Sequence, residues 1–216
     1  MLFPEFAGKL IHLSHGMLRL PSGKMSSRTG DVITAELLIS EVEKMIGEKM
    51  KDRELNPKDK LEIGEIIAIG ALKYSILKQA IGGDIIFDFD KSVSFDGDSG
   101  PYLQYAYTRA KSILENSKNQ KIKASLKIPM ENTTEVEVLL ERFSGIVSRA
   151  GKEMAPHHIV SYLVELARAF NHYYAENRIV GADDKYSPYK VALTEAVAIV
   201  MENGLNILGI RVPSEM

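Results

Sequence analysis

The sequence predicts a mainly α-helical protein, an antiparallel helix bundle preceded by a small α+β segment. After Pro101, apolar residues recur at helical spacing in four successive stretches. Prolines and capping residues mark where these stretches begin. Before that point, short apolar runs broken by Gly16 and Pro21 indicate strands beside two helices. We therefore predict two domains, residues 1–98 and residues 99–216.

The first predicted domain combines strands and helices. Leu10–Leu13 and Met17–Leu20 are brief apolar runs typical of short strands. Thr34 is a suitable N-cap for a helix that we expect to reach about residue 51. The pair Asn56-Pro57 predicts the start of a second helix, which is apolar on most sides and should be buried.

The chain then changes character before the bundle. Gly82-Gly83 is expected to end the second helix, and residues 84–100 are interpreted as an extended connector between two units. A polar linker over about residues 116–132 should divide the first bundle helix from the second. Four antiparallel helices with connecting links predict a bundle. The signals for their N-termini are Pro101, the capping box Thr134–Glu137, Pro156, and Ser187-Pro188, and Gly209 closes the last helix.

Composition limits the possible functions. The chain has no cysteine, which excludes disulfides, thiolate zinc sites and a thiol nucleophile, and its net charge is -2. It has no signal-peptide pattern and no run of about 18 apolar residues, so we expect a cytoplasmic protein without membrane contact. Asp96 and Asp98 fall short of a calcium loop, because positions five, six and twelve of that loop would hold Gly100, Pro101 and Tyr107. The histidine pairs lack acidic or thiolate companions at ligand spacing, so we predict no metal site.

The segment Gly23–Gly30, Gly-Lys-Met-Ser-Ser-Arg-Thr-Gly, is rich in groups that bind phosphate. Lys24 offers a point charge, Arg28 a planar fork of donors, and the hydroxyls of Ser26, Ser27 and Thr29 add further donors. A solvated surface turn is the alternative interpretation. The glycine spacing of a P-loop is missing, which excludes that kind of nucleotide hydrolase.

Two groups of aromatic and polar residues stand on predicted bundle helices. Tyr102, Tyr105 and Arg109 follow one another at spacings of three and four, so they share one helix face. Asn171, Tyr173 and Tyr174 form the second group. Such residues can stack on unpaired bases, but half-buried core tyrosines would give the same pattern.

Residues 109–127 form a basic segment, in which six lysines and arginines face only Glu115. This segment is either a phosphate-contacting patch or a solvated helix end with its loop.

Several motifs together resemble a known family. Lys24-Met-Ser-Ser-Arg28 resembles the Lys-Met-Ser-Lys-Ser signature of class I aminoacyl-tRNA synthetases, and its extension over Gly23–Gly30 resembles the arginyl-tRNA synthetase version. Downstream, Phe87-Asp88, Gly100–Ala106 and Arg109 resemble the entrance to that family's helical anticodon-binding domain. Pieces of residues 156–174 and the ending 205–216 resemble its last helices. The resemblance runs from about Gly16 to Met216, in the family's order.

The resemblance implies an arginine–tRNA ligase reaction. Arginine and ATP, with Mg²⁺, would give arginyl-adenylate and pyrophosphate, and the arginyl group would then move to the tRNA 3′ end. The family's loop implies that Lys24 is the main contact to the ATP phosphates, supported by Met25, Ser26 and Ser27. Arg28 would share the role that a second lysine has in many class I enzymes, because Ser27 occupies that lysine's position here.

The resemblance also implies contacts to arginine tRNA. The family's anticodon contacts map onto Tyr102, Tyr174 and Met216. Tyr105, Arg109 and Asn171 would line the same surface, and Lys111 with the following lysines to Lys127 would contact phosphates.

Part of the family's machinery has no counterpart in this sequence. His12-Leu-Ser-His15 resembles the class I His-x-Gly-His motif, but it stands too close to Lys24 to leave room for the nucleotide-binding fold between them. We therefore interpret the chain as the C-terminal portion of the synthetase, with an N-terminal catalytic part as its partner, and expect no tRNA charging by this chain alone. The alternatives are a stand-alone, non-catalytic RNA-binding module derived from the synthetase, and a purely structural helical interaction domain.

Overall fold

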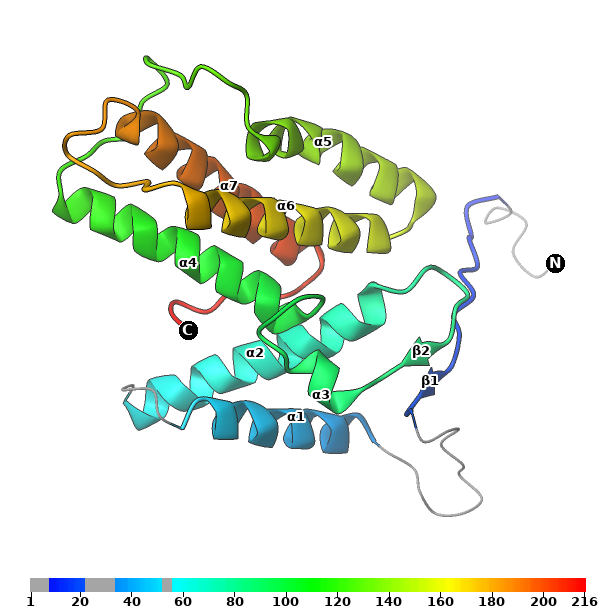
Figure 1. Cartoon of the computed structure of the whole chain (residues 1–216). Helices are drawn as coiled ribbons and strands as arrows, with labels where there is room; N and C mark the ends of the chain where they lie inside the picture. Colours follow the sequence, from blue (N-terminus) through cyan, green and yellow to red (C-terminus); the bar gives the residue numbers. More distant parts are fainter. Residues whose placement is uncertain (1–7, 22–33, 52–55) are drawn as a thin grey trace, which may run out of the picture.

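The structure is a computed structural model, which describes residues 8–21, 34–51 and 56–216 of the 216-residue chain. Its C-terminal half is a bundle of the four helices α4 (Gly100–Asn119), α5 (Glu135–Glu153), α6 (His157–Glu176) and α7 (Ser187–Ile207) (Figure 1). This confirms the predicted mainly α fold with a small β element.

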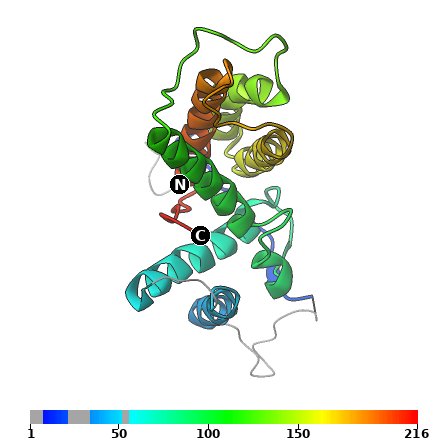
Figure 2. The same ribbon diagram turned by 60° about the vertical axis from the view of Figure 1, so that its left-hand side comes forward.

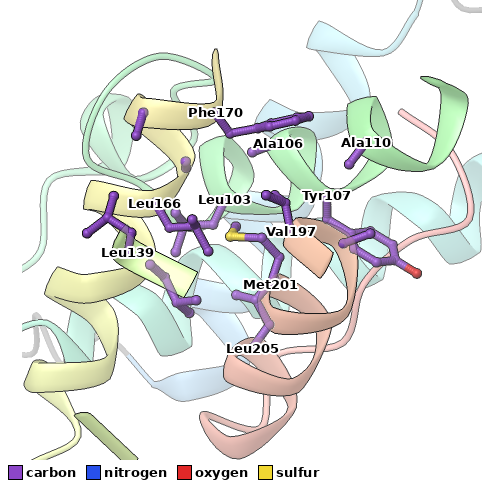
Figure 3. Close-up of a cluster of buried hydrophobic side chains, with 14 of the residues drawn as sticks. Leu103, Ala106, Tyr107, Ala110, Leu139, Leu166, Phe170, Val197, Met201 and Leu205 are labelled. Atoms are coloured by element: carbon purple, nitrogen blue, oxygen red, sulfur yellow. The ribbon is translucent and has the colours of Figure 1, made fainter. Parts of the chain in front are cut away.

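The bundle closes around an apolar core to which all four helices contribute (Figure 3). Leu103 of α4, Leu166 of α6 and Met201 of α7 are fully shielded from solvent. Leu139 brings α5 onto the same cluster. Burying each such side chain contributes roughly 1.5–3 kcal/mol, so the core fixes how α4 and α6 lie against each other.

A second, smaller core lies beneath the bundle (Figure 1). Helices α1 (Ala35–Lys49) and α2 (Pro57–Leu77) pack together there through Val42, Ile46 and Ile67. The prediction that α2 is buried on most sides is confirmed, because its buried residues run around the helix. The division into domains at residue 98 stays a prediction, since α2 packs on α4 as well as on α1.

The β element is much smaller than the sequence suggested. It consists of β1 (Leu18–Arg19) and β2 (Ile85–Ile86), which pair in parallel, with Leu18 opposite Ile85. The strand predicted at Leu10–Leu13 is wrong: these residues are exposed and have no regular structure. Apolar character alone does not predict a strand, because a strand also needs a neighbouring strand to pair with.

The interpretation of residues 84–100 as an extended connector is wrong in part. The segment contains β2 and a short helix, α3 (Phe89–Ser92), and Phe87 is fully buried in the smaller core. Asp98 accepts a hydrogen bond from the Tyr74 hydroxyl of α2. Burial, and then Asp98, raises the pKa of Tyr74, so the phenol stays protonated and donates. The acidic stretch therefore ties the chain to α2.

The capping signals were accurate at three helix starts. Thr34 and Asn56 cap α1 and α2, and Thr134 and Glu137 form the reciprocal capping box of α5. The expectation that Ser187 caps α7 is wrong, since Ser187 is the first residue of that helix. Its hydroxyl accepts from the Gly181 N–H at 3.0 Å and donates to the Ile179 carbonyl at 2.6 Å, which pins the preceding loop.

Helix ends were predicted less accurately than helix starts. Helix α2 ends at Leu77, several residues before the predicted Gly82-Gly83. The start of α4 is also shifted: the helix begins at Gly100, one residue before Pro101, and Ser99 is its cap. The link between α4 and α5 covers residues 120–134. Gly209 follows α7 with a φ of +68°, the left-handed conformation expected of a closing glycine.

Helices α2 and α4 cross at close range. A Cβ atom at Gly100 would lie 2.6 Å from the Gly70 carbonyl oxygen, so this crossing requires glycine. Beside it, the fully buried Gln104 donates from Nε2 to the carbonyls of Ile66 (3.2 Å) and Arg211 (2.8 Å). Gln104 thus joins α4 to α2 and to the C-terminal tail, which ends beside both helices in two views (Figures 1 and 2).

Within the described ranges, no helix combines the length and the apolar character that crossing a bilayer requires.

Candidate nucleic-acid interface

The predicted phosphate loop cannot be placed. Its residues lie outside the described part of the chain, so their roles stay predictions. They are Lys24, Met25, Ser26, Ser27 and Arg28.

Five other predicted site residues meet in the valley between α4 and α6. The Nη1 of Arg109 donates to Oδ1 of Asn171 at 2.6 Å. Asn171 in turn donates from Nδ2 to the Tyr102 hydroxyl at 3.1 Å. The Arg109 guanidinium carbon lies 4.7 Å from the centre of the Tyr105 ring and 5.5 Å from that of Tyr174. We call Tyr102, Tyr105, Arg109, Asn171 and Tyr174 the Arg109 cluster.

The cluster lies at the surface of the bundle. Tyr102, Tyr105 and Arg109 are half-buried, and 43% of Tyr174 is exposed. Tyr173 differs, since it belongs to the bundle core, where burial raises its pKa to about 12. Of the aromatic group predicted on α6, Tyr174 therefore faces the valley, whereas Tyr173 is a core tyrosine, as the alternative interpretation expected.

A cavity of about 450 Å³ adjoins the cluster on the side of the smaller core. Tyr105 and Arg109 line it from α4, and Asp96 and Met216 line it from the preceding loop and the C-terminal end. Met216 is partly buried and packs against the core of α1 and α2. The predicted site residue that is most distant in sequence thus shares a cavity with Arg109.

Lys111 is not part of this arrangement. It stands two residues after Arg109 on α4, about 200° around the helix axis. There it lines a separate groove of about 540 Å³ between α4 and α7, together with Lys118, Lys121 and the acidic residues Glu195 and Glu202. We call this the lysine groove. Its position separates Lys111, Lys118 and Lys121 from the Arg109 cluster.

The chemistry of the cluster suits unpaired nucleobases. The tyrosine rings offer faces for stacking, while Asn171 and Arg109 offer fixed polar groups at the edges. One hydrogen bond to Asn171 and two ring contacts hold the guanidinium in place before any ligand arrives, and Asn171 is itself held by its hydrogen bond to Tyr102. Among the described residues, no group of three or more metal-ligating side chains gathers.

Sequence reasoning did not single out Gln104, which joins α4 to α2, or Asn116 and Gln120, which line a cavity with Tyr174. The sequence gives no sign of the role of Gln104, because a glutamine on an apolar helix face does not indicate that it will donate to two distant backbone carbonyls. Asn116 and Gln120 follow Arg109 by seven and eleven residues, a spacing that places them on its face of α4. That spacing was available in the sequence as a signal.

Comparison with known proteins decides the family. A sequence profile described as the DALR anticodon binding domain matches residues 103–216, more than half of the chain. The chain belongs to this family. The match begins at the fourth residue of α4 and covers the rest of the bundle, so it includes every residue of the Arg109 cluster except Tyr102, which lies one position before it.

The relatives of this DALR-family chain share one printed name, arginine–tRNA ligase. That of Halothermothrix orenii is 34% identical and that of Borrelia hermsii is 38% identical, over 98% and 96% of this chain. The solved Thermus thermophilus arginyl-tRNA synthetase is 27% identical over 99% of the chain, with a TM-score of 0.84. These matches confirm the predicted resemblance to a C-terminal portion of arginyl-tRNA synthetase. The chain spans 36–38% of the length of these proteins.

Proposed function

We propose that this chain is the tRNA-binding part of an arginine–tRNA ligase, and that the Arg109 cluster receives unpaired bases of the anticodon loop of arginine tRNA. One observation carries the proposal. Five residues from two helices, 62 positions apart at Arg109 and Asn171, form one connected group at the surface of an anticodon-binding domain.

The geometry favours bases over other ligands. A base stacked on a tyrosine contributes roughly 1–3 kcal/mol and needs an exposed ring face. Tyr174 has such exposure, and Arg109 is held between two rings instead of pointing into solvent. Met216 lines the adjoining cavity, where it offers an adaptable apolar contact for a base.

The lysine groove has a different proposed role. Lys111 and its neighbours would attract the phosphate backbone without reading sequence, in a manner that depends on salt. Their separation from the cluster predicts that the two contributions to binding can be removed independently.

The remaining functions of the ligase are proposed from the resemblance and the relatives' names. Lys24 to Arg28 would contact the ATP phosphates, and a catalytic part would supply the arginine and adenylate sites. Positioned cations act most strongly where charge develops in the transition state, which fits a loop with Lys24 and Arg28. By this proposal the 216-residue chain alone does not charge tRNA, and arginylation by it would contradict that part.

The test is a binding titration with arginine tRNA. Tyr102→Ala should weaken binding at least about fivefold, which corresponds to the low end of the range for one stacked base. A changed anticodon should weaken binding of the unaltered chain by a similar factor and make the Tyr102→Ala effect small. Tyr102→Phe keeps the ring and should lose less than Tyr102→Ala.

Tyr186 provides the matched control. It is also half-buried and its hydroxyl also bonds one side chain, Glu131, but it does not belong to the Arg109 cluster. Tyr186→Ala should bind tRNA like the unaltered chain. Equal affinity of Tyr102→Ala and the unaltered chain for arginine tRNA would reject the proposed surface.

A further inference from the structure

The valley between α4 and α6 continues past the Arg109 cluster. Asn116 and Gln120 extend the same face of α4 toward its C-terminal end. Opposite them, α6 ends and the chain turns through Asn177 and Arg178. Together with Tyr174 these residues line a cavity of about 560 Å³, which we call the amide cavity.

Local hydrogen bonds hold the walls of the amide cavity. Asn177 donates to the Tyr173 carbonyl from both its backbone N–H and Nδ2, each at 3.0 Å. Arg178 donates from Nε to the Val180 carbonyl at 3.1 Å, and Gln120 donates to Asn116 Oδ1 at 3.3 Å. Beneath them, Ile179 and Val180 are anchored in the bundle core. The walls are therefore in place without a ligand.

Among the described residues that line the cavity, those hydrogen bonds leave both donors and acceptors unused. The Nδ2 of Asn116 and the terminal nitrogens of Arg178 can still donate, and Oε1 of Gln120 and Oδ1 of Asn177 can still accept. Glu176, which also lines the cavity, adds an acceptor. A site for a bare phosphate would offer donors alone, and this carboxylate would repel an anion.

We propose that the amide cavity binds a second unpaired base of the RNA loop, next along the strand from the base at the Arg109 cluster. A base edge carries donors and acceptors side by side, which matches the mixture of groups on the walls. Tyr174 links the two sites, because it contacts Arg109 and also lines the amide cavity. This inference rests on the proposed function and extends it from the Arg109 cluster to a second, separate site.

The experiment combines protein variants with altered RNA. The probe is a fluorescent anticodon stem-loop of arginine tRNA, together with copies in which one loop nucleotide at a time lacks its base. The protein is the 216-residue chain carrying Asn116→Ala and Gln120→Ala, two exposed positions whose truncation leaves the core intact. The matched control carries Asn203→Ala and Asn206→Ala, two exposed amides on α7 outside the valley.

The double variant should bind the intact stem-loop about fivefold more weakly than the unaltered chain, the low end for one base contact. With the stem-loop that lacks the base proposed to occupy the amide cavity, both proteins should bind equally. A Tyr102→Ala chain should instead lose its defect with a different abasic copy, the one for the Arg109 cluster. The control variant should bind every copy like the unaltered chain.

Two results would overturn the inference. One is unchanged affinity of the Asn116→Ala/Gln120→Ala variant while Tyr102→Ala is defective. The other is a defect of the same size with every abasic copy, which would indicate no base site. Failure of the proposed function looks different, because Tyr102→Ala would then also bind the intact stem-loop normally.

Discussion

Helix α4 presents two faces of opposite design. On the α6 side, Arg109 is held by one hydrogen bond and two aromatic rings. On the α7 side, Lys111 and Lys118 are exposed and share their groove with Glu195 and Glu202. The face with one cation is organised, and the face with more cations is not.

The difference shows why charge density alone is a poor guide to a binding surface. A long exposed lysine loses conformational entropy when it binds, whereas a guanidinium already fixed between rings has less to lose. Specific recognition is therefore expected at the Arg109 cluster, and salt-sensitive attraction at the lysine groove.

The largest expected effect comes from removing the centre of the organised face. Arg109→Ala should weaken binding of arginine tRNA by about tenfold to a hundredfold, since it removes a cation and frees Asn171, Tyr105 and Tyr174 from their shared partner. Titration of labelled tRNA measures the change. Arg109→Lys keeps the charge without the fork and should recover only part of the affinity. Full recovery by lysine would mean that charge matters here and geometry does not.

An intermediate effect on stability alone is expected from Glu137, which lies on neither face of α4. Its carboxylate accepts from Thr134 N–H at 2.7 Å and from the Tyr189 hydroxyl. Burial raises the pKa of Glu137, but the hydrogen bonds from Tyr189 and Thr134 outweigh it and leave the pKa below 4.5. The folded state therefore prefers the ionised form, and this stabilisation is present above pH 4.5 and lost as the pH falls through the lowered value.

Glu137→Gln should accordingly lower the free energy of unfolding by about 1 kcal/mol at neutral pH, the usual value of a helix cap. Urea denaturation should show this deficit shrinking as the pH falls through the lowered pKa of Glu137, because the protonated carboxyl is then uncharged like the glutamine amide. At neutral pH the folded variant should bind arginine tRNA normally. If the folded Glu137→Gln variant lost tRNA binding at neutral pH, destabilisation alone would weaken binding as Arg109→Ala does. The loss in Arg109→Ala could then not be assigned to the α6 side of α4.

The smallest effect is expected on the lysine face. Lys111→Ala combined with Lys118→Ala should weaken binding about twofold to threefold at low salt and hardly at all at high salt, because exposed charges are screened. The plot of log affinity against log salt should become shallower by about 0.7 for each phosphate that is no longer neutralised. Lys44→Ala with Lys58→Ala is the control, since it removes the same charge from exposed positions on α1 and α2. A salt-independent loss as large as that of Arg109→Ala would place specific contacts at the lysine groove.

The sequence was informative wherever a feature depends on near neighbours. Thr134 and Glu137 predicted their capping box because both partners stand within one helical turn. Tyr102, Tyr105 and Arg109 were correctly placed on one face because helical periodicity fixes it. Ser187 shows the limit of this reasoning, since its hydroxyl bonds a loop that folds back on it instead of its own helix.

The small strands show the same limit. Leu10–Leu13 has the composition of a strand, yet the two strands that pair within the described ranges are Leu18–Arg19 and Ile85–Ile86. A strand exists only where a second segment of chain offers its backbone, and nothing within either segment records that partner.

By itself the sequence determined the helical bundle, the starts of its helices to within about one residue, the family and most members of the candidate site. These follow from spacing, capping chemistry and motif order, which are local properties of the chain. Only the tertiary structure decided that Asn171 bonds Arg109, that Met216 lines the adjoining cavity, and that Lys111 lies on the opposite face. Such pairings depend on how the core sets one helix against another, and packing brings together residues whose separation in the chain carries no sign of it.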